Sequence, residues 1–196
     1  MNMNTLDIEQ HPLPLFLPQN AHLLMLGSFP PPKSRWSMDF YYPNLQNDMW
    51  RIFGLVFFKD KDYFVKPEMK AFDKEKIVQF LENKGIALGD TARSVIRLKD
   101  NASDAFLQVV ESLDLSLVLG QLPECKVVVV TGQKAAETLC KMTGAVLPAV
   151  GSFTEFEKAG EVMRLYRMPS SSRAYPMPLA KKAESYSLMF NELNIR

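Results

Sequence analysis

The sequence has few cysteines and histidines, no excess of either charge and no long apolar run. Cys125 and Cys140 are its only cysteines, too few for a zinc or iron–sulfur site held by thiolates, and we expect both to be reduced in a cytoplasmic protein. With 23 basic and 22 acidic residues the net charge is +1, so any affinity for nucleic acid must come from a local patch. The apolar runs are too short to span a membrane, and the acidic, Asn-rich start does not resemble a signal peptide.

Strand-like and helix-like patterns alternate along the chain. Continuous apolar runs predict strands at 23–26, 86–88, 126–130 and 162–168. Apolar periodicity and end signals predict helices at 74–84, 133–142 and 179–193, with others beginning near residues 50, 103 and 112. Such alternation favours a parallel sheet covered on both faces. We therefore expect a single α/β domain over residues 1–196, a three-layer α/β/α fold with a central four-stranded parallel sheet, in which residues 1–21 form a surface arm.

The segment from Leu23 to Trp50 carries the strongest local signals. Its first apolar run ends at Gly27, and three prolines, Pro30 to Pro32, then require a rigid turn. The interval from Gly27 to Ser34 has the spacing of a phosphate-binding P-loop. That motif needs a glycine where Pro32 stands and backbone N–H groups that prolines lack, so the sequence argues against a nucleotide triphosphatase.

Three pieces of this segment together resemble a known motif. Gly27-Ser28-Phe29-Pro30, Tyr41-Tyr42 and Asn47-Asp48-Met49-Trp50 are similar to the first motif of the uracil-DNA glycosylase superfamily, nearest to its deoxyinosine (hypoxanthine) and mismatch-specific branches. Residues 85–90 with Ser94 and Arg97 are similar to the second strand and loop of that family, and residues 168–172 to its late Pro-Ser loop, which enters the DNA minor groove. His11-Pro12-Leu13-Pro14 is similar to the lead-in of the deoxyinosine branch.

The resemblance implies a uracil-DNA glycosylase-like fold and a function. The protein would be a monofunctional DNA glycosylase that hydrolyses the N-glycosidic bond of deaminated bases, uracil or hypoxanthine, in base excision repair. It would act as a monomer on DNA with deaminated or mismatched bases, without metal or cofactor. Asn47 would be catalytic, as in the deoxyinosine branch. The base would contact Gly27, Ser28, Phe29, Asp90 and Tyr42, which would stack on it, and the DNA would contact Arg97, Ser170, Ser171, Ser172 and Arg173.

Three departures from the family pattern keep other interpretations open. Phe29 and Met168 stand at the two usual catalytic positions, and Asn44 stands where relatives often have histidine. The chain could therefore be a weak or inactive glycosylase-fold protein that binds nucleic acid, or an enzyme that acts on a free nucleoside. Asn47 could equally cap a loop, and Tyr42 could be a packing residue.

The strand ends also predict a basic edge. In a parallel sheet the carboxyl ends of all strands face one crevice. The residues that follow them include Lys33, Arg35, Arg93, Arg97, Lys134, Arg173, Lys181 and Lys182. If they cluster, they would suit contacts to a phosphate backbone. His11 and His22, both before the first strand, are expected to be structural or solvated rather than catalytic.

Overall fold

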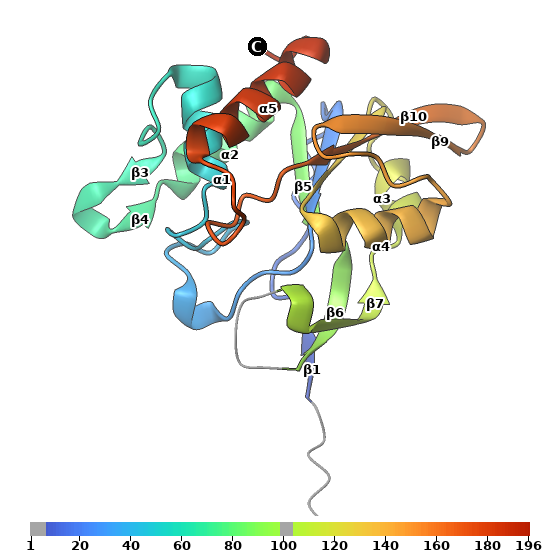
Figure 1. The fold of residues 1–196 in the computed structure, drawn as a ribbon, viewed down its shortest axis with the longest axis horizontal. Coiled ribbons are helices and arrows are strands. Elements are labelled where there is room, and N and C mark those ends of the chain that lie inside the picture. The colour runs from blue at the N-terminus through green and yellow to red at the C-terminus, as the bar shows by residue number, and fades with distance from the viewer. Residues whose placement is uncertain (1–6, 99–103) are drawn as a thin grey trace, which may run out of the picture.

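The computed structural model describes residues 7–98 and 104–196 and has a five-stranded central sheet (Figure 1). The strand order is β5-β2-β8-β10-β9. Its members are β2 (Leu23–Gly27), β5 (Ile86–Asp90), β8 (Val127–Thr131), β9 (Ser152–Lys158) and β10 (Glu161–Met168). All four strands predicted from apolar runs are present, as β2, β5, β8 and β10, and they pair in parallel. The prediction of four strands is wrong by one, because β9 adds an antiparallel edge to β10.

The edge strand β9 was missed because only two of its residues, Phe153 and Phe156, are apolar. Only Phe156 of its seven residues is buried, as expected for a strand with one solvated face. The connection to β10 is a two-residue loop, Ala159-Gly160, in which both residues have positive φ, the conformation of a tight hairpin. The sequence signal was therefore a hairpin, and it was hidden by the absence of a continuous apolar run.

Alternate side chains of the sheet belong to two hydrophobic clusters. Leu23 and Met25 of β2 pack with α1 (Met49–Phe53), α2 (Lys74–Lys84) and α5 (Leu179–Glu192). Leu24 and Leu26 of the same strand pack with α3 (Leu115–Gly120) and α4 (Gln133–Thr143). Because successive residues of a strand point to opposite faces, the two helix groups cover opposite faces of β2. Burial on both faces explains why the parallel strands of the central sheet appear in the sequence as continuous apolar runs.

Helix ends follow the signals in the sequence. The Asp73 carboxylate accepts a hydrogen bond from the Lys76 backbone N–H at the start of α2, and Gly85 ends that helix in a left-handed conformation. Gly144 ends α4 in the same way. The helix expected from residue 50 is α1 followed by a π-helical segment, Gly54–Phe58. Two short strands, β3 (Val65–Lys66) and β4 (Ala71–Phe72), follow that segment.

A second, antiparallel sheet corrects three predictions for the N-terminal half. It consists of β1 (Ile8–Gln10), β6 (Ala92–Arg97) and β7 (Leu107–Ser112), with β6 in the middle. The arm is therefore partly a strand, the loop expected after residue 90 is β6, and β7 stands where a helix was expected. The predicted start of that helix, near residue 103, lies outside the described residues. In the described part of the chain no helix is long and apolar enough to cross a membrane.

Candidate functional site

The parallel strands of the central sheet end side by side at one edge. Gly27 of β2 pairs with Asp90 of β5, and Met168 of β10 pairs with Thr131 of β8. Ligands of open α/β sheets bind beyond such carboxyl ends. A pocket of about 700 Å³ lies there. That volume falls within the range of roughly 300–1,000 Å³ that is typical of small-molecule sites.

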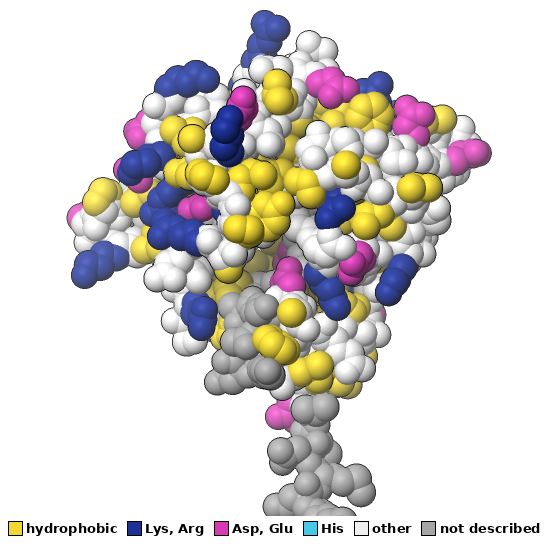
Figure 2. Space-filling model, in the orientation of Figure 1, with side chains coloured by type: hydrophobic (Ala, Val, Ile, Leu, Met, Phe, Trp, Pro, Cys, Tyr) yellow, Lys and Arg dark blue, Asp and Glu magenta, His cyan; other side chains and the backbone are white. Residues whose placement is uncertain are grey.

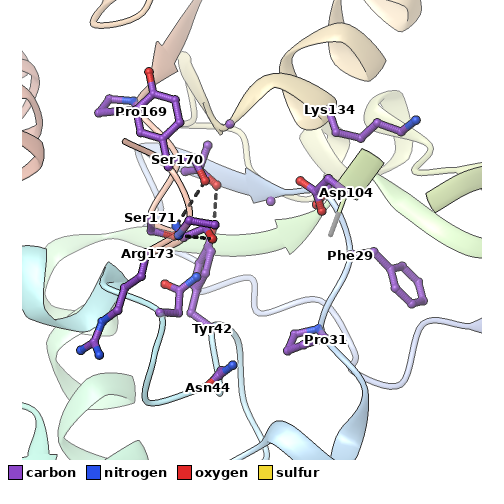
Figure 3. A pocket seen from close by; sticks show the side chains of 18 of the residues that line it. Phe29, Pro31, Tyr42, Asn44, Asp104, Lys134, Pro169, Ser170, Ser171 and Arg173 are labelled. Carbon is purple, nitrogen blue, oxygen red and sulfur yellow. Dashed lines mark hydrogen bonds between the residues drawn. The ribbon is translucent and has the colours of Figure 1, made fainter. Parts of the chain in front are cut away.

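Most of the residues nominated from the sequence line this pocket. The lining includes Gly27, Ser28, Phe29, Tyr42, Asn47, Asp90, Ser170, Ser171, Ser172 and Arg173. Figure 3 shows Ser170, Ser171 and Arg173 on one side, Asp104 and Lys134 on the other, and Tyr42 between them. Arg97 is the exception. Its Nε lies 3.1 Å from Glu9 Oε2, and it is not among the lining residues.

Asn47 lies against the triple-serine loop, as the site hypothesis requires. Asn47 and Ser172 form an isolated antiparallel bridge, and the neighbouring Asp48 backbone N–H donates to the Ser171 carbonyl at 2.8 Å. The Asn47 side-chain oxygen accepts a hydrogen bond from the Met49 backbone N–H at 2.9 Å, at the start of α1. Asn47 thus forms a turn with the first residue of α1, whose N-cap is Asp48, and also lines the pocket. Its amide nitrogen is the side-chain donor available to a ligand.

A buried ion cluster ties these two loops together, and the sequence analysis missed it. The Asp48 carboxylate, 6% exposed, lies 3.0 Å from Arg173 Nε and 3.2 Å from Lys182 Nζ. Lys182 is fully buried and also donates to the Ser172 carbonyl at 2.7 Å. Lys182, predicted to be part of an exposed basic edge, is therefore a structural residue in the interior.

Asp90 is a buried carboxylate held by the N-terminal arm. Its Oδ2 lies 2.8 Å from His11 Nε2, and the His11 side chain has no exposed surface. Burial raises the pKa of Asp90, and the hydrogen bond from His11 opposes that rise. A Cβ at Gly27 would stand 2.4 Å from Asp90 Oδ1, so this packing requires a glycine. His11, expected to be structural or solvated, is buried against a carboxylate that lines the pocket.

A second carboxylate, Asp104, enters the pocket from the short 3-10 helix Asp104–Phe106 before β7. The Ser28 hydroxyl donates to Asp104 Oδ1 at 2.7 Å. Burial raises the pKa of Asp104, while the Ser28 hydrogen bond and the positive charges of Lys134 and Arg97 lower it. The sequence analysis did not nominate Asp104. Its partner Ser28 lies 76 positions away, so no local pattern could connect the two.

The two aromatic candidates differ in where their rings lie. Tyr42 has a left-handed backbone, φ 51°, and its hydroxyl lies 3.1 Å from the Thr131 hydroxyl. Burial raises the pKa of Tyr42, so the phenol stays protonated at neutral pH. Phe29 instead packs in a core cluster with β6 and β7, edge-on to His11. Tyr42 also packs edge-on against Trp50, but it is the more exposed of the two candidates, whereas Phe29 lines the pocket as part of the core.

The basic edge is weaker than the sequence suggested. Arg97 pairs with Glu9, Lys181 pairs with Glu184, and Lys182 is buried. Arg35, Lys134, Arg167 and Arg173 line the pocket. Figure 2 shows dark blue basic side chains and magenta carboxylates together around the hollow of this face, with hydrophobic side chains beside it. The face is mixed in charge rather than strongly positive.

Comparisons with known proteins give a fold but no family. No family model matches the chain, and no curated protein matches it either. Within residues 7–98 and 104–196, no cluster of three or more His, Cys, Asp or Glu side chains is arranged to hold a metal ion. Among solved structures, the chain is similar to a Methanosarcina acetivorans protein described as a "putative Uracil DNA glycosylase". The identity is 22%, the TM-score is 0.63, and the match covers 96% of this chain and 99% of that one. The chain thus has the fold of that protein over nearly its whole length.

Proposed function

We propose that this protein is a monofunctional DNA glycosylase that hydrolyses the N-glycosidic bond of deaminated bases, uracil or hypoxanthine, in DNA. One observation carries the proposal. Asn47, Tyr42 and the 170–173 loop come from distant parts of the chain and line one pocket of about 700 Å³ at the strand ends. The likeness in fold to a protein described as a uracil DNA glycosylase supports the same conclusion. No metal or cofactor is part of the proposal.

The pocket would receive a base turned out of the helix. An enzyme that acts on a base must extrude it and hold it, commonly against an aromatic ring. The Tyr42 ring would stack on the base, with its hydroxyl fixed by Thr131. Asp90 and the backbone around Ser28 would contact the polar edge of the base. The 170–173 loop would lie against the minor groove, and Arg173, whose side chain is half exposed, would contact a phosphate.

Asn47 would stabilise the departing base. Cleavage gives a sugar with oxocarbenium character and a base that carries negative charge. Since the Asn47 oxygen accepts from Met49, its NH₂ group would donate to the base as that charge develops. Preorganised donors of this kind typically account for roughly 10²–10³-fold in rate. DNA with a deaminated base would therefore be the partner of this chain.

Substitution of Asn47 tests this role. Asn47→Ala removes both the side-chain oxygen that accepts from the Met49 N–H and the NH₂ donor, whereas Asn47→Ser keeps a hydroxyl acceptor for the Met49 N–H. We expect both variants to lose about 10²-fold in single-turnover base release, and only Asn47→Ala to lose stability. Release would be measured on duplexes that contain uracil, hypoxanthine or xanthine. Full activity of Asn47→Ala would remove Asn47 from the mechanism.

The second candidate is a glycosylase-fold protein that binds nucleic acid without releasing a base. Phe29 and Met168 favour it, because both are buried apolar residues at the two positions where the resembled family carries catalytic groups. The same panel separates the two candidates. Salt-dependent DNA binding without release of any of the three bases would support the second candidate and reject the first.

A further inference from the structure

Only two acidic residues, Asp90 and Asp104, are among the described residues that line the pocket, and their oxygens are used differently. Asp90 Oδ2 accepts from buried His11, and Asp90 Oδ1 packs against the Gly27 backbone, where even a methyl group would stand 2.4 Å away. Both oxygens already contact the protein, so Asp90 is a poorer proton acceptor than a carboxylate with a free oxygen. Each oxygen keeps a lone pair that can accept from the edge of a ligand.

Asp104 has an oxygen to spare. Its Oδ1 accepts the Ser28 hydroxyl at 2.7 Å, and its Oδ2 makes no hydrogen bond to any residue of the described ranges. Figure 3 shows the Asp104 carboxylate pointing into the pocket, on the side opposite Ser170 and Ser171. Ser28 is also the neighbour of Phe29, which has no group that could handle a proton. The Asp104 carboxylate thus lies beside the Ser28-Phe29 turn, where Phe29 supplies no proton-accepting group.

From this geometry we infer that Asp104 is a further catalytic residue, the general base that activates the attacking water, with Ser28 as its positioning residue. The inference rests on the proposed glycosylase function. In the reaction the water oxygen forms a bond to the anomeric carbon, and the bond from that carbon to the base nitrogen breaks. The electron pair leaves with the base, and the water proton passes to Asp104 Oδ2. A proton from solvent then neutralises the base.

The electrical surroundings of Asp104 suit this role. Burial raises the pKa of its carboxyl, and the nearby charge of Asp90 adds to the rise. The Ser28 hydroxyl, Lys134 and Arg97 act in the opposite direction. A carboxylate with a raised pKa is a stronger base than an exposed one, and it must be ionised to work. Base release should therefore fall as the pH drops through the pKa of Asp104.

The experiment compares single-turnover base release across pH for the full chain and its variants. The duplexes contain a single uracil, hypoxanthine or xanthine. Asp104→Asn should lower the rate about 10²-fold or more and abolish the acidic limb. Ser28→Ala should move that limb to higher pH, because it removes a hydrogen bond that lowers the pKa of Asp104. Asp104→Glu should recover part of the activity.

Two controls separate chemistry from folding and binding. Asp39→Asn, an exposed carboxylate outside the pocket lining, should leave both rate and limb unchanged. Affinity for a duplex with an abasic-site analogue and the unfolding midpoint should be the same for Asp104→Asn and wild type. If wild type releases bases and Asp104→Asn keeps the rate and the limb, the inference is wrong and the glycosylase survives. If wild type releases none of the three bases, the proposed function fails and the inference fails with it.

Discussion

The two sides of the pocket are built by opposite means. One side, the serine wall, consists of Asn47, Asp48 and residues 170–173. Its charges are paired, because Asp48 meets both Lys182 and Arg173. The other side, the carboxylate wall, consists of Ser28, Asp90 and Asp104. Its acids are held by a histidine and a hydroxyl rather than by a lysine or an arginine, and burial raises the pKa of each. Ion pairs fix a loop in place, whereas acids with a raised pKa retain chemistry that a substrate can use.

The difference predicts what each side contributes. On the serine wall a lost partner would leave a buried charge uncompensated, so stability should suffer first. On the carboxylate wall a changed acid alters proton uptake or close packing, so activity or local shape should respond. The two sides can be tested separately, because no hydrogen bond between the described residues joins Asp48 or Lys182 to Asp90 or Asp104.

The largest expected effect is on the serine wall. Lys182→Met removes the buried ammonium and leaves Asp48 with Arg173, which is half exposed. Breaking a buried pair from one side typically costs about 3–5 kcal/mol of unfolding free energy. Urea denaturation would measure the loss. A double variant, Asp48→Asn with Lys182→Met, should be more stable than Lys182→Met alone, because no charge is then stranded.

Lys181, the neighbour of Lys182 in the sequence, provides the control. Lys181 lies on the exposed side of α5 and pairs with Glu184, so Lys181→Met should leave the denaturation midpoint unchanged. Equal effects of the two substitutions would mean that the Asp48–Lys182 pair does not hold the loop. The comparison of the two walls would then lose its basis.

A smaller effect is expected on the carboxylate wall from a single methyl group. Gly27→Ala places a Cβ 2.4 Å from Asp90 Oδ1 and 3.4 Å from the Tyr42 hydroxyl. His11 holds the Asp90 carboxylate from the other side, so the clash must displace a buried group. Overpacking of this kind costs roughly 1–3 kcal/mol. Gly120→Ala is the matched control, since its Cβ would meet nothing within 4 Å. Similar unfolding free energies for the two variants would show that Asp90 yields easily.

The positions of the strand ends could be predicted, because burial on both faces leaves a visible trace in the sequence. The apolar runs at β2, β5, β8 and β10 located four strands, and the rule for parallel sheets then brought Asn47, Tyr42 and Ser170 to one pocket. Strands with a solvated face left a weaker trace. The hairpin strand β9 and the sheet formed by β1, β6 and β7 were missed for that reason.

Polar partners that are distant in the sequence could not be predicted. His11 and Asp90 are 79 positions apart, and Asp48 and Lys182 are 134 apart. Neither pair shows a periodicity or spacing in the sequence that would distinguish its residues from ordinary charged residues on the surface. For the same reason Arg97 was counted as exposed, although its partner Glu9 comes from the β1 strand that the sequence did not indicate. Such pairs become visible only when the fold brings the segments together.

The smallest expected effect concerns two paired arginines that differ in exposure. Arg173 lines the pocket with a half-exposed side chain, whereas the side chain of Arg97 is 10% exposed and lies against Glu9. We expect Arg173→Gln to weaken binding to abasic-site DNA and to lower the slope of log K against log salt by about 1. Arg97→Gln should leave the slope unchanged, because a guanidinium with a 10% exposed side chain offers little surface to a phosphate. Fluorescence anisotropy titrations at several salt concentrations would give both slopes. A slope that changes for Arg97→Gln and not for Arg173→Gln would restore Arg97 as the phosphate contact and would place the DNA over the β1-β6 edge rather than over the serine wall.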